Sequence, residues 1–140
     1  MRRTLCALFF LAIGCSYEKD DVVDAAHAQM QAQVDQLRLA SKERSASPLI
    51  EYEIGRLFAE HGLMDSARAA FERSLAIHQA FPEAHLQLAQ IYFSEGHLNE
   101  SALSYEQVVH FDLENAAAHN NLGYVYLSLI HISEPTRLLA

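Results

Sequence analysis

Two stretches of the chain, EYEIGRLFAEHGLMDSARAAFERSLAIH at residues 51–78 and AHLQLAQIYFSEGHLNESALSYEQVVHF at residues 84–111, share one order of small, bulky and turn-forming residues. When the chain is aligned with itself at a shift of about 34 residues, equivalent positions hold residues of the same size class. The equivalent sets are Pro48 and Pro82; Gly55, Ala89 and Gly123; Phe58, Tyr92 and Tyr126; Gly62 and Gly96; Ala67 and Ser101; Phe71 and Tyr105; and Ile77 and Phe111. A constant period of this length indicates a stack of similar supersecondary units.

Each unit is expected to be a pair of antiparallel helices joined by a tight turn. The helices are predicted over residues 48–61, 65–79, 82–95, 99–112 and from about residue 116. Pro48 and Pro82 suit the first helical position, where the missing N–H loses no hydrogen bond. Glycine suits the turn because it adopts left-handed backbone conformations without strain. Asp65, Asn99 and Asn115 are the predicted N-cap residues.

Packing between the two helices of a pair follows from the same alignment. The small residues allow the helices to approach closely, and bulky aromatic side chains at Phe71 and Tyr105 fill the space beside them. Ser101 stands where the preceding unit has Ala67, and its hydroxyl needs a hydrogen-bond acceptor. The carbonyl one turn back on its own helix is the expected acceptor.

The two stretches, together with AHNNLGYVY at residues 118–126, resemble tetratricopeptide repeats. The resemblance covers residues 48–126 and implies an all-α fold: a helix-turn-helix solenoid, here with an extra N-terminal helix. The expected organisation is a first repeat at 48–81, a second at 82–115 and the start of a third at 116–126.

An additional helix is predicted over residues 20–43, before the short polar connector at 41–47. Apolar side chains recur there at spacings of three and four and form one stripe. The stripe consists of Val23, Ala26, His27, Met30, Val34 and Leu37. This helix either covers the first repeat, as terminal repeats usually require, or binds a partner or a second copy.

The first residues, MRRTLCALFFLAIGCSYEKDD, have the order of a secretory signal: basic residues, a short apolar run, then small residues. The stretch LAIGC resembles a bacterial lipobox, which implies a leader at 1–14, lipidation of Cys15, and a tether with the N-terminal helix at 15–47. A plain secretory signal is the alternative. Ser16, following the Cys, favours the outer membrane in bacteria that resemble the enteric ones, with the protein on the periplasmic side.

Charge argues against nucleic acid as a partner. The formal net charge is −8, and loss of Arg2 and Arg3 with the leader makes it more negative. Binding to a phosphate backbone requires clustered Lys and Arg. The mature chain would also hold only one thiol, which excludes an internal disulfide.

The resemblance also implies a peptide-binding groove on the concave face of the repeats. Carrying over the groove positions gives Tyr52, Arg56, Ala59, Leu86, Gln90, Phe93, Asn120 and Tyr124. The variety of repeat that clamps a peptide carboxylate needs Lys and Asn at Tyr52 and Arg56, and Lys and Arg at Ala117 and Asn121. Those residues are not there, so recognition of a chaperone's C-terminal carboxylate is not expected.

Signatures of catalysis are lacking in the sequence, which has no phosphate-cradling Gly loop, no CxxC and no nucleophile elbow. His85 and His119 occupy one repeat position and could share a metal, but neither has a second ligand at i+4. Partly exposed helix positions are the alternative reading. We therefore expect no enzyme activity, cofactor, metal or small-molecule substrate.

The repeat pattern stops near the end of the chain, where LSLIHISEPTR at 127–137 brings Pro135 and no turn glycine. This string resembles one reading frame of the adaptor used in transposase-based sequencing libraries. Residues 127–140 are therefore expected to be adaptor-derived, and the natural sequence is expected to continue differently after Tyr126. A natural tail is the alternative.

Taken with the leader, the repeats predict a non-catalytic scaffold for protein–protein interaction, lipid-anchored in the bacterial outer membrane. It resembles lipoproteins that assist pilus secretin assembly or organise peptidoglycan hydrolases, so its partner is expected to be a protein or peptide of the cell envelope. The alternative is the docking module of an envelope enzyme whose catalytic domain is missing from this fragment.

Overall fold

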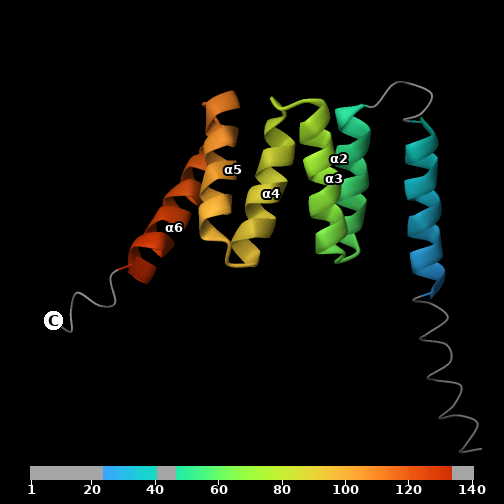
Figure 1. Ribbon diagram of the computed structural model, residues 1–140, viewed down its shortest axis with the longest axis horizontal. Helices are drawn as coiled ribbons and strands as arrows, with labels where there is room; N and C mark the ends of the chain where they lie inside the picture. The colour runs from blue at the N-terminus through green and yellow to red at the C-terminus, as the bar shows by residue number, and fades with distance from the viewer. Residues whose placement is uncertain (1–23, 41–46, 134–140) are drawn as a thin grey trace, which may run out of the picture. The chain divides into compact units, whose positions relative to one another are not determined.

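A computed structural model describes residues 24–40 and 47–133, which contain helices, turns and short connections but no strands. One helix spans residues 24–40. The others are α2 (Pro48–Glu60), α3 (Met64–Ile77), α4 (Pro82–Ser94), α5 (Leu98–Phe111) and α6 (Ala116–Ser133), shown in Figure 1. The chain divides into two compact units, Met1–Ala40 and Ser41–Ala140.

The helix at residues 24–40 confirms the expected N-terminal helix, within shorter limits than 20–43. Met30 and Val34 of its apolar stripe are buried, whereas Ala26 and His27 are exposed. Its role as a cover for the first repeat or as a partner-binding helix stays a prediction. The leader, Cys15 and Val23 lie outside the described residues.

In the second unit, α2 to α5 begin and end within two residues of the predicted positions, and α6 begins at the predicted residue 116. Pro48 and Pro82 are the first residues of α2 and α4, as expected for a residue without an N–H. Helices α3 and α5 begin one residue early, at Met64 and Leu98. The predicted pairing of helices within a repeat is confirmed.

Two of the three predicted N-caps are wrong. Because α3 and α5 begin early, Asp65 and Asn99 lie inside the first helical turn, and neither helix has a side-chain cap. Asp65 instead accepts a hydrogen bond from Arg68 at 2.6 Å. Asn115 does cap α6, since its side-chain oxygen accepts from the backbone N–H of Ala118 at 3.0 Å.

Glycine makes both helix-to-helix turns within a repeat. Gly62 and Gly96 have φ angles of 75° and 79°, in the left-handed region. After Gly62, the N–H of Leu63 donates to the carbonyl of Phe58 at 2.9 Å. After Gly96, the N–H of His97 donates to the carbonyl of Tyr92 at 2.8 Å. These are Schellman motifs, which satisfy helix C-terminal carbonyls and reverse the chain.

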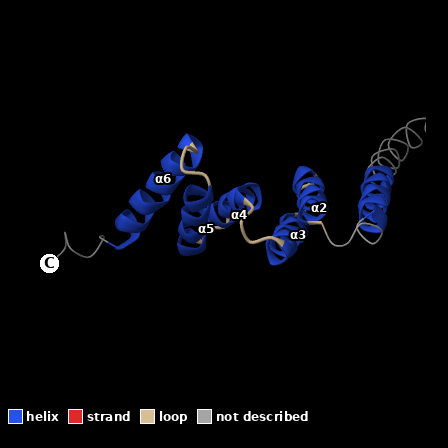
Figure 2. Cartoon of the chain, turned by 90° about the horizontal axis from the view of Figure 1, so that it is seen from above, coloured by secondary structure: helices blue, strands red, loops and turns tan. Residues whose placement is uncertain are grey.

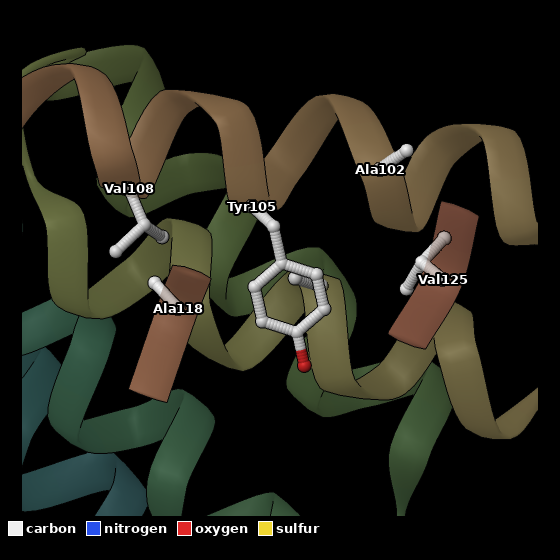
Figure 3. Close-up of a cluster of buried hydrophobic side chains, with 6 residues drawn as sticks. Ala102, Tyr105, Val108, Ala118 and Val125 are labelled. Atoms are coloured by element: carbon white, nitrogen blue, oxygen red, sulfur yellow. The ribbon is translucent and has the colours of Figure 1, made fainter. Parts of the chain in front are cut away.

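Within the second unit, helices α2 to α6 form one row in which each packs mainly against its neighbours in the sequence, as Figure 2 shows from above. Gly55 of α2 lies directly against the Phe71 ring of α3, confirming that a small residue permits the close approach. A second cluster joins α4, α5 and α6, and its members appear in Figure 3. They are Ala89, Ala102, Tyr105, Val108, Ala118 and Val125.

Two buried serine hydroxyls connect the paired helices. Ser101 donates to the carbonyl of Ala89 on α4 at 2.8 Å, so the predicted acceptor on its own helix is wrong. Ser74 donates to the carbonyl of Pro48 at 2.7 Å. A hydroxyl facing the neighbouring backbone meets a carbonyl there, so the array tolerates Ser where the repeat pattern favours Ala.

Contacts between successive repeats recur with the period of the sequence. The Tyr92 hydroxyl donates to Glu72 at 3.3 Å, and one repeat later Tyr126 donates to Glu106. Side chains as far along as Tyr126 therefore occupy the positions that the repeat register gives them.

Helix α6 continues past the repeat-like sequence to Ser133. Several of its large apolar side chains are exposed: Tyr124, Tyr126, Leu127, Ile130 and Ile132. No helix within the described part of the chain is long and apolar enough to cross a membrane. Residues 134–140, with Pro135, lie outside the described residues.

Candidate functional site

A cavity of about 320 Å³ lies where α4, α5 and α6 meet. Helix α4 contributes two lining residues, α5 one and α6 three. The lining residues are Gln90, Phe93, Tyr105, Asn121, Tyr124 and Val125. The cavity forms because α5 packs against both α4 and α6, so that side chains of all three helices line one space.

The floor of the cavity is formed by two buried side chains. Tyr105 is 3% exposed and Val125 is 1% exposed, and both belong to the buried cluster. Figure 3 shows the Tyr105 ring between Ala118 and Val125, which come from α6. Burial raises the pKa of the Tyr105 phenol, opposed by a hydrogen bond with Asn121, so the floor is uncharged at neutral pH.

The rim is aromatic and accessible. Phe93 is 41% exposed and Tyr124 is 70% exposed. The amides of Gln90, which is exposed, and of Asn121, which is half-buried, also line the cavity and offer both donors and acceptors. The cavity can therefore receive an apolar group and hydrogen-bond an adjacent amide, without a charge of its own.

Three of the predicted groove residues, Gln90, Phe93 and Tyr124, line this cavity together. Asn120 is exposed, and it is the following residue, Asn121, that lines the cavity. Successive residues of an α-helix are turned by about 100° from one another, so Asn120 and Asn121 lie on different faces of α6.

The remaining predicted groove residues have other contacts. The Tyr52 ring packs on Phe71 and Phe81, with centroids 5.6 and 5.2 Å apart. Arg56 forms ion pairs with Glu53 at 3.4 Å and Glu60 at 3.3 Å.

Leu86 is partly buried against the cluster of α4, α5 and α6, and Ala59 is partly exposed on α2. None of these four lines the cavity, and a binding role for them stays a prediction.

Sequence reasoning did not place Tyr105, Asn121 and Val125 in the site. The sequence predicts only that Tyr105 fills space within the helix pair, whereas Tyr105 also lines the cavity. The available signal was the i, i+3, i+4 spacing of Asn121, Tyr124 and Val125, which puts the three on one helix face.

The two repeat-equivalent histidines have a structural role. His85 Nε2 lies 3.0 Å from the carbonyl of Gln79, and His119 Nε2 lies 3.1 Å from that of Leu113, one repeat further on. A carbonyl only accepts, so each Nε2 carries the proton and ties down the connection before its helix. Burial lowers the pKa of His85, opposed by the bond to Gln79. Within residues 24–40 and 47–133, no group of three or more metal-ligating side chains occurs.

Comparison with known proteins supports the fold. Residues 89–129 match the family described as TPR repeat. No curated protein matches the sequence. Among solved structures, the chain is similar to the first TPR of Spaghetti (RPAP3) bound to the HSP90 peptide SRMEEVD, with a TM-score of 0.65 and 17% identity over 89% of this chain and 93% of that one. The chain therefore has the tetratricopeptide-repeat fold, an all-α helical solenoid.

Proposed function

We propose that this protein is a non-catalytic interaction scaffold that binds a peptide segment of a partner protein in the cavity between α4, α5 and α6. The observation that carries the proposal is the combination in that cavity of exposed aromatic rings, two amides and a buried floor. Ligand sites of this kind are concave and mostly apolar, with a few polar groups that orient the ligand.

A peptide suits this cavity better than a compact metabolite. A volume of about 320 Å³ is near the lower limit for small-molecule sites, and the accessible rim leaves room for a chain that continues past both sides. The amides of Gln90 and Asn121 can hydrogen-bond a peptide backbone while a side chain enters the apolar part. That the structurally similar TPR of RPAP3 was solved with a peptide agrees with this proposal.

The peptide bound by the RPAP3 domain, SRMEEVD, is acidic, and this protein should not bind an equivalent ligand. Tyr52, Arg56, Ala117 and Asn121 stand where a carboxylate clamp needs Lys, Asn, Lys and Arg. Arg56 is also engaged by two carboxylates. Recognition in this protein therefore has a different chemical basis.

The test is capture of partners from a bacterial envelope extract by the wild type and by the double variant Phe93→Ala, Tyr124→Ala. Both side chains are accessible, so the array should remain folded. Aromatic anchors at interfaces commonly contribute about 2 kcal/mol each, so the double variant should lose its specific partner.

A matched control is Leu103→Ala, Leu113→Ala, which removes apolar side chains that are 62% and 75% exposed outside the cavity. Its captured proteins should equal those of the wild type. If instead the cavity variant retains every partner while its circular dichroism stays native, the cavity is not the binding site.

We propose further that the scaffold is held at the bacterial outer membrane by acylation of Cys15 and serves an envelope machine such as pilus assembly or the organisation of peptidoglycan hydrolases. The support is the leader and the LAIGC stretch. Mass spectrometry of the membrane-extracted protein should show the acyl chains on Cys15, and Cys15→Ser should release the protein from the membrane. A wild type that lacks the modification would exclude the anchor.

Residues 127–140 are, in this proposal, adaptor-derived. Helix α6 continues through 127–133 because Leu127, Leu129, Ile130 and Ile132 are compatible with a helix, and the TPR match extends to residue 129, so helicity does not decide the origin of the segment. Resequencing of the source DNA decides it: a genomic read that encodes LSLIHISEPTR would overturn the adaptor origin.

A further inference from the structure

The cavity between α4, α5 and α6 has no charged residue in its lining, although the surrounding protein is strongly acidic. Its two amides and its aromatic and aliphatic side chains are all neutral at physiological pH. A charged side chain that entered this cavity would lose hydration without gaining a counter-ion, at a considerable cost in free energy. The group that enters must therefore be uncharged.

The helices that surround the cavity present charge of one sign only. Helix α4 carries Glu83 and α5 carries Glu100 and Glu106, α6 carries no Asp or Glu, and none of the three has Lys or Arg. From residue 74 to residue 133 the chain has no Lys or Arg at all, whereas the connections add further acids. Those acids are Glu95, which is paired with Arg68, and Asp112 and Glu114.

The three arginines in residues 47–133 are already paired. Arg68 contacts Asp65 and Glu95, both at 2.6 Å. Arg73 contacts Glu51 at 2.8 Å. The third, Arg56, lies between two glutamates of its own helix. No arginine in this part of the chain is thus left to attract an acidic ligand.

We infer that the occupant of this cavity is a peptide segment with one aromatic or aliphatic side chain flanked by Lys or Arg residues. The apolar side chain packs on Tyr105 and Val125 between Phe93 and Tyr124, and the flanking cations remain in water near the rim. The net negative charge of α4, α5 and their connections attracts these cations, and at physiological salt such attraction is screened beyond about 8–10 Å. Charge complementarity of this kind raises the association rate and rejects acidic competitors. The inference rests on the proposed peptide-binding function and adds the chemical class of the peptide.

The test uses short synthetic peptides of equal length, labelled for fluorescence anisotropy, and the full chain in a non-ionic detergent. Four peptides separate the requirement for an apolar side chain from the requirement for flanking positive charge. They are Phe flanked by Lys and Arg, Ala in the same basic background, Phe flanked by Ser and Gly, and Phe flanked by Asp and Glu. We expect the basic Phe peptide to bind on the order of tenfold more tightly than the neutral one and the acidic one to bind least. The difference should shrink as salt is raised.

Two substitutions of Gln90, an exposed lining residue, introduce charges of opposite sign at the cavity without changing the floor residues. Gln90→Glu should tighten binding of the basic Phe peptide several-fold, and Gln90→Lys should weaken it and improve binding of the acidic peptide. Phe93→Ala should weaken the basic Phe peptide to the level of the basic Ala peptide. A loss seen with both Gln90 variants alike would mean that charge at the rim has no part in selection and would overturn the inference.

The outcomes separate this inference from the proposed function. If the neutral or acidic Phe peptide binds best and Phe93→Ala abolishes its binding, the cavity binds peptides but the basic class is wrong. If no Phe peptide shows binding that depends on Phe93, the cavity is not a peptide site and both proposals fail. Binding of the two basic peptides with equal affinity would reveal attraction by net charge alone and would also overturn the inference.

Discussion

Gly55 and Gly123 stand at the same repeat position, two periods apart, yet the structure predicts that only Gly123→Ala stabilises the protein. A Cβ atom added at Gly55 would lie 2.6 Å from Phe71 Cε1 and 2.7 Å from Cδ1. The Phe71 ring is fully buried and packs against Tyr52, so it cannot move aside freely. A Cβ added at Gly123 would meet no atom within 4 Å.

The magnitudes follow from two terms. Ala is more favourable than Gly within a helix by about 1 kcal/mol, and this gain applies at both positions. Overpacking a well-packed site costs about 1–3 kcal/mol, and this cost applies at Gly55 alone. Gly123→Ala should therefore stabilise the array by about 1 kcal/mol, and the two variants should differ by about 1–3 kcal/mol.

Urea unfolding followed by far-UV circular dichroism measures both variants under one condition. For a domain of this size, 1 kcal/mol corresponds to about 4–8 °C in melting temperature, so thermal scans resolve the expected difference. In a Phe71→Leu background, Gly55→Ala should lose its penalty because the clashing ring is gone. If Gly55→Ala stabilises the wild-type array as much as Gly123→Ala does, the close approach of α2 to α3 is not as described.

Three further predictions concern single contacts. Asn115→Ala removes the N-cap of α6 and should lower the free energy of unfolding by about 0.5–2 kcal/mol. The control Asn99→Ala changes a residue that caps no helix and should cost much less. Equal losses of stability in urea unfolding would contradict the assignment of Asn115 as a cap. Ser101→Ala removes a buried hydroxyl that donates to an α4 carbonyl and should lower the free energy of unfolding by about 0.5–1.5 kcal/mol. A variant more stable than the wild type would show that this hydrogen bond does not stabilise the fold. Burial lowers the pKa of His85 below its ordinary 6.5, so its stabilising contribution is present above pH 6.5 and is lost as pH falls through the folded-state pKa. Stability should therefore decline less steeply below pH 6.5 in His85→Gln than in the wild type, and parallel pH profiles would refute this assignment.

Much of the fold was predictable because it depends on local features of the chain. The period of the repeat, the proline at the start of α2 and α4, and the glycine at each tight turn each act over a few residues. Such features specify a helix and its ends before any distant contact forms. The limits of α2 to α5 were accordingly predicted to within two residues, with α3 and α5 beginning one residue early at Met64 and Leu98, whereas the N-terminal helix as described, 24–40, is shorter than predicted at both ends.

The site was only partly predictable, because its walls come from helices that meet through packing. Gln90, Phe93 and Tyr124 were expected from the resemblance to a known repeat, whereas Asn121 and Val125 depend on how α6 is rotated about its axis. That rotation is decided by which side chains of α6 fit against α5, and a difference of one residue changes the face by about 100°.

The sequence by itself thus determined that the chain is a row of paired helices, because residue spacing and turn chemistry are local. Only the tertiary structure decided that Ser101 bonds across to α4, that Gly55 is crowded while its equivalent Gly123 is not, and that an uncharged cavity lies within an acidic array. Equivalent residues in a repeat share a sequence context but not a set of neighbours. What lies beside each one depends on the packing of whole helices, which local pattern does not specify.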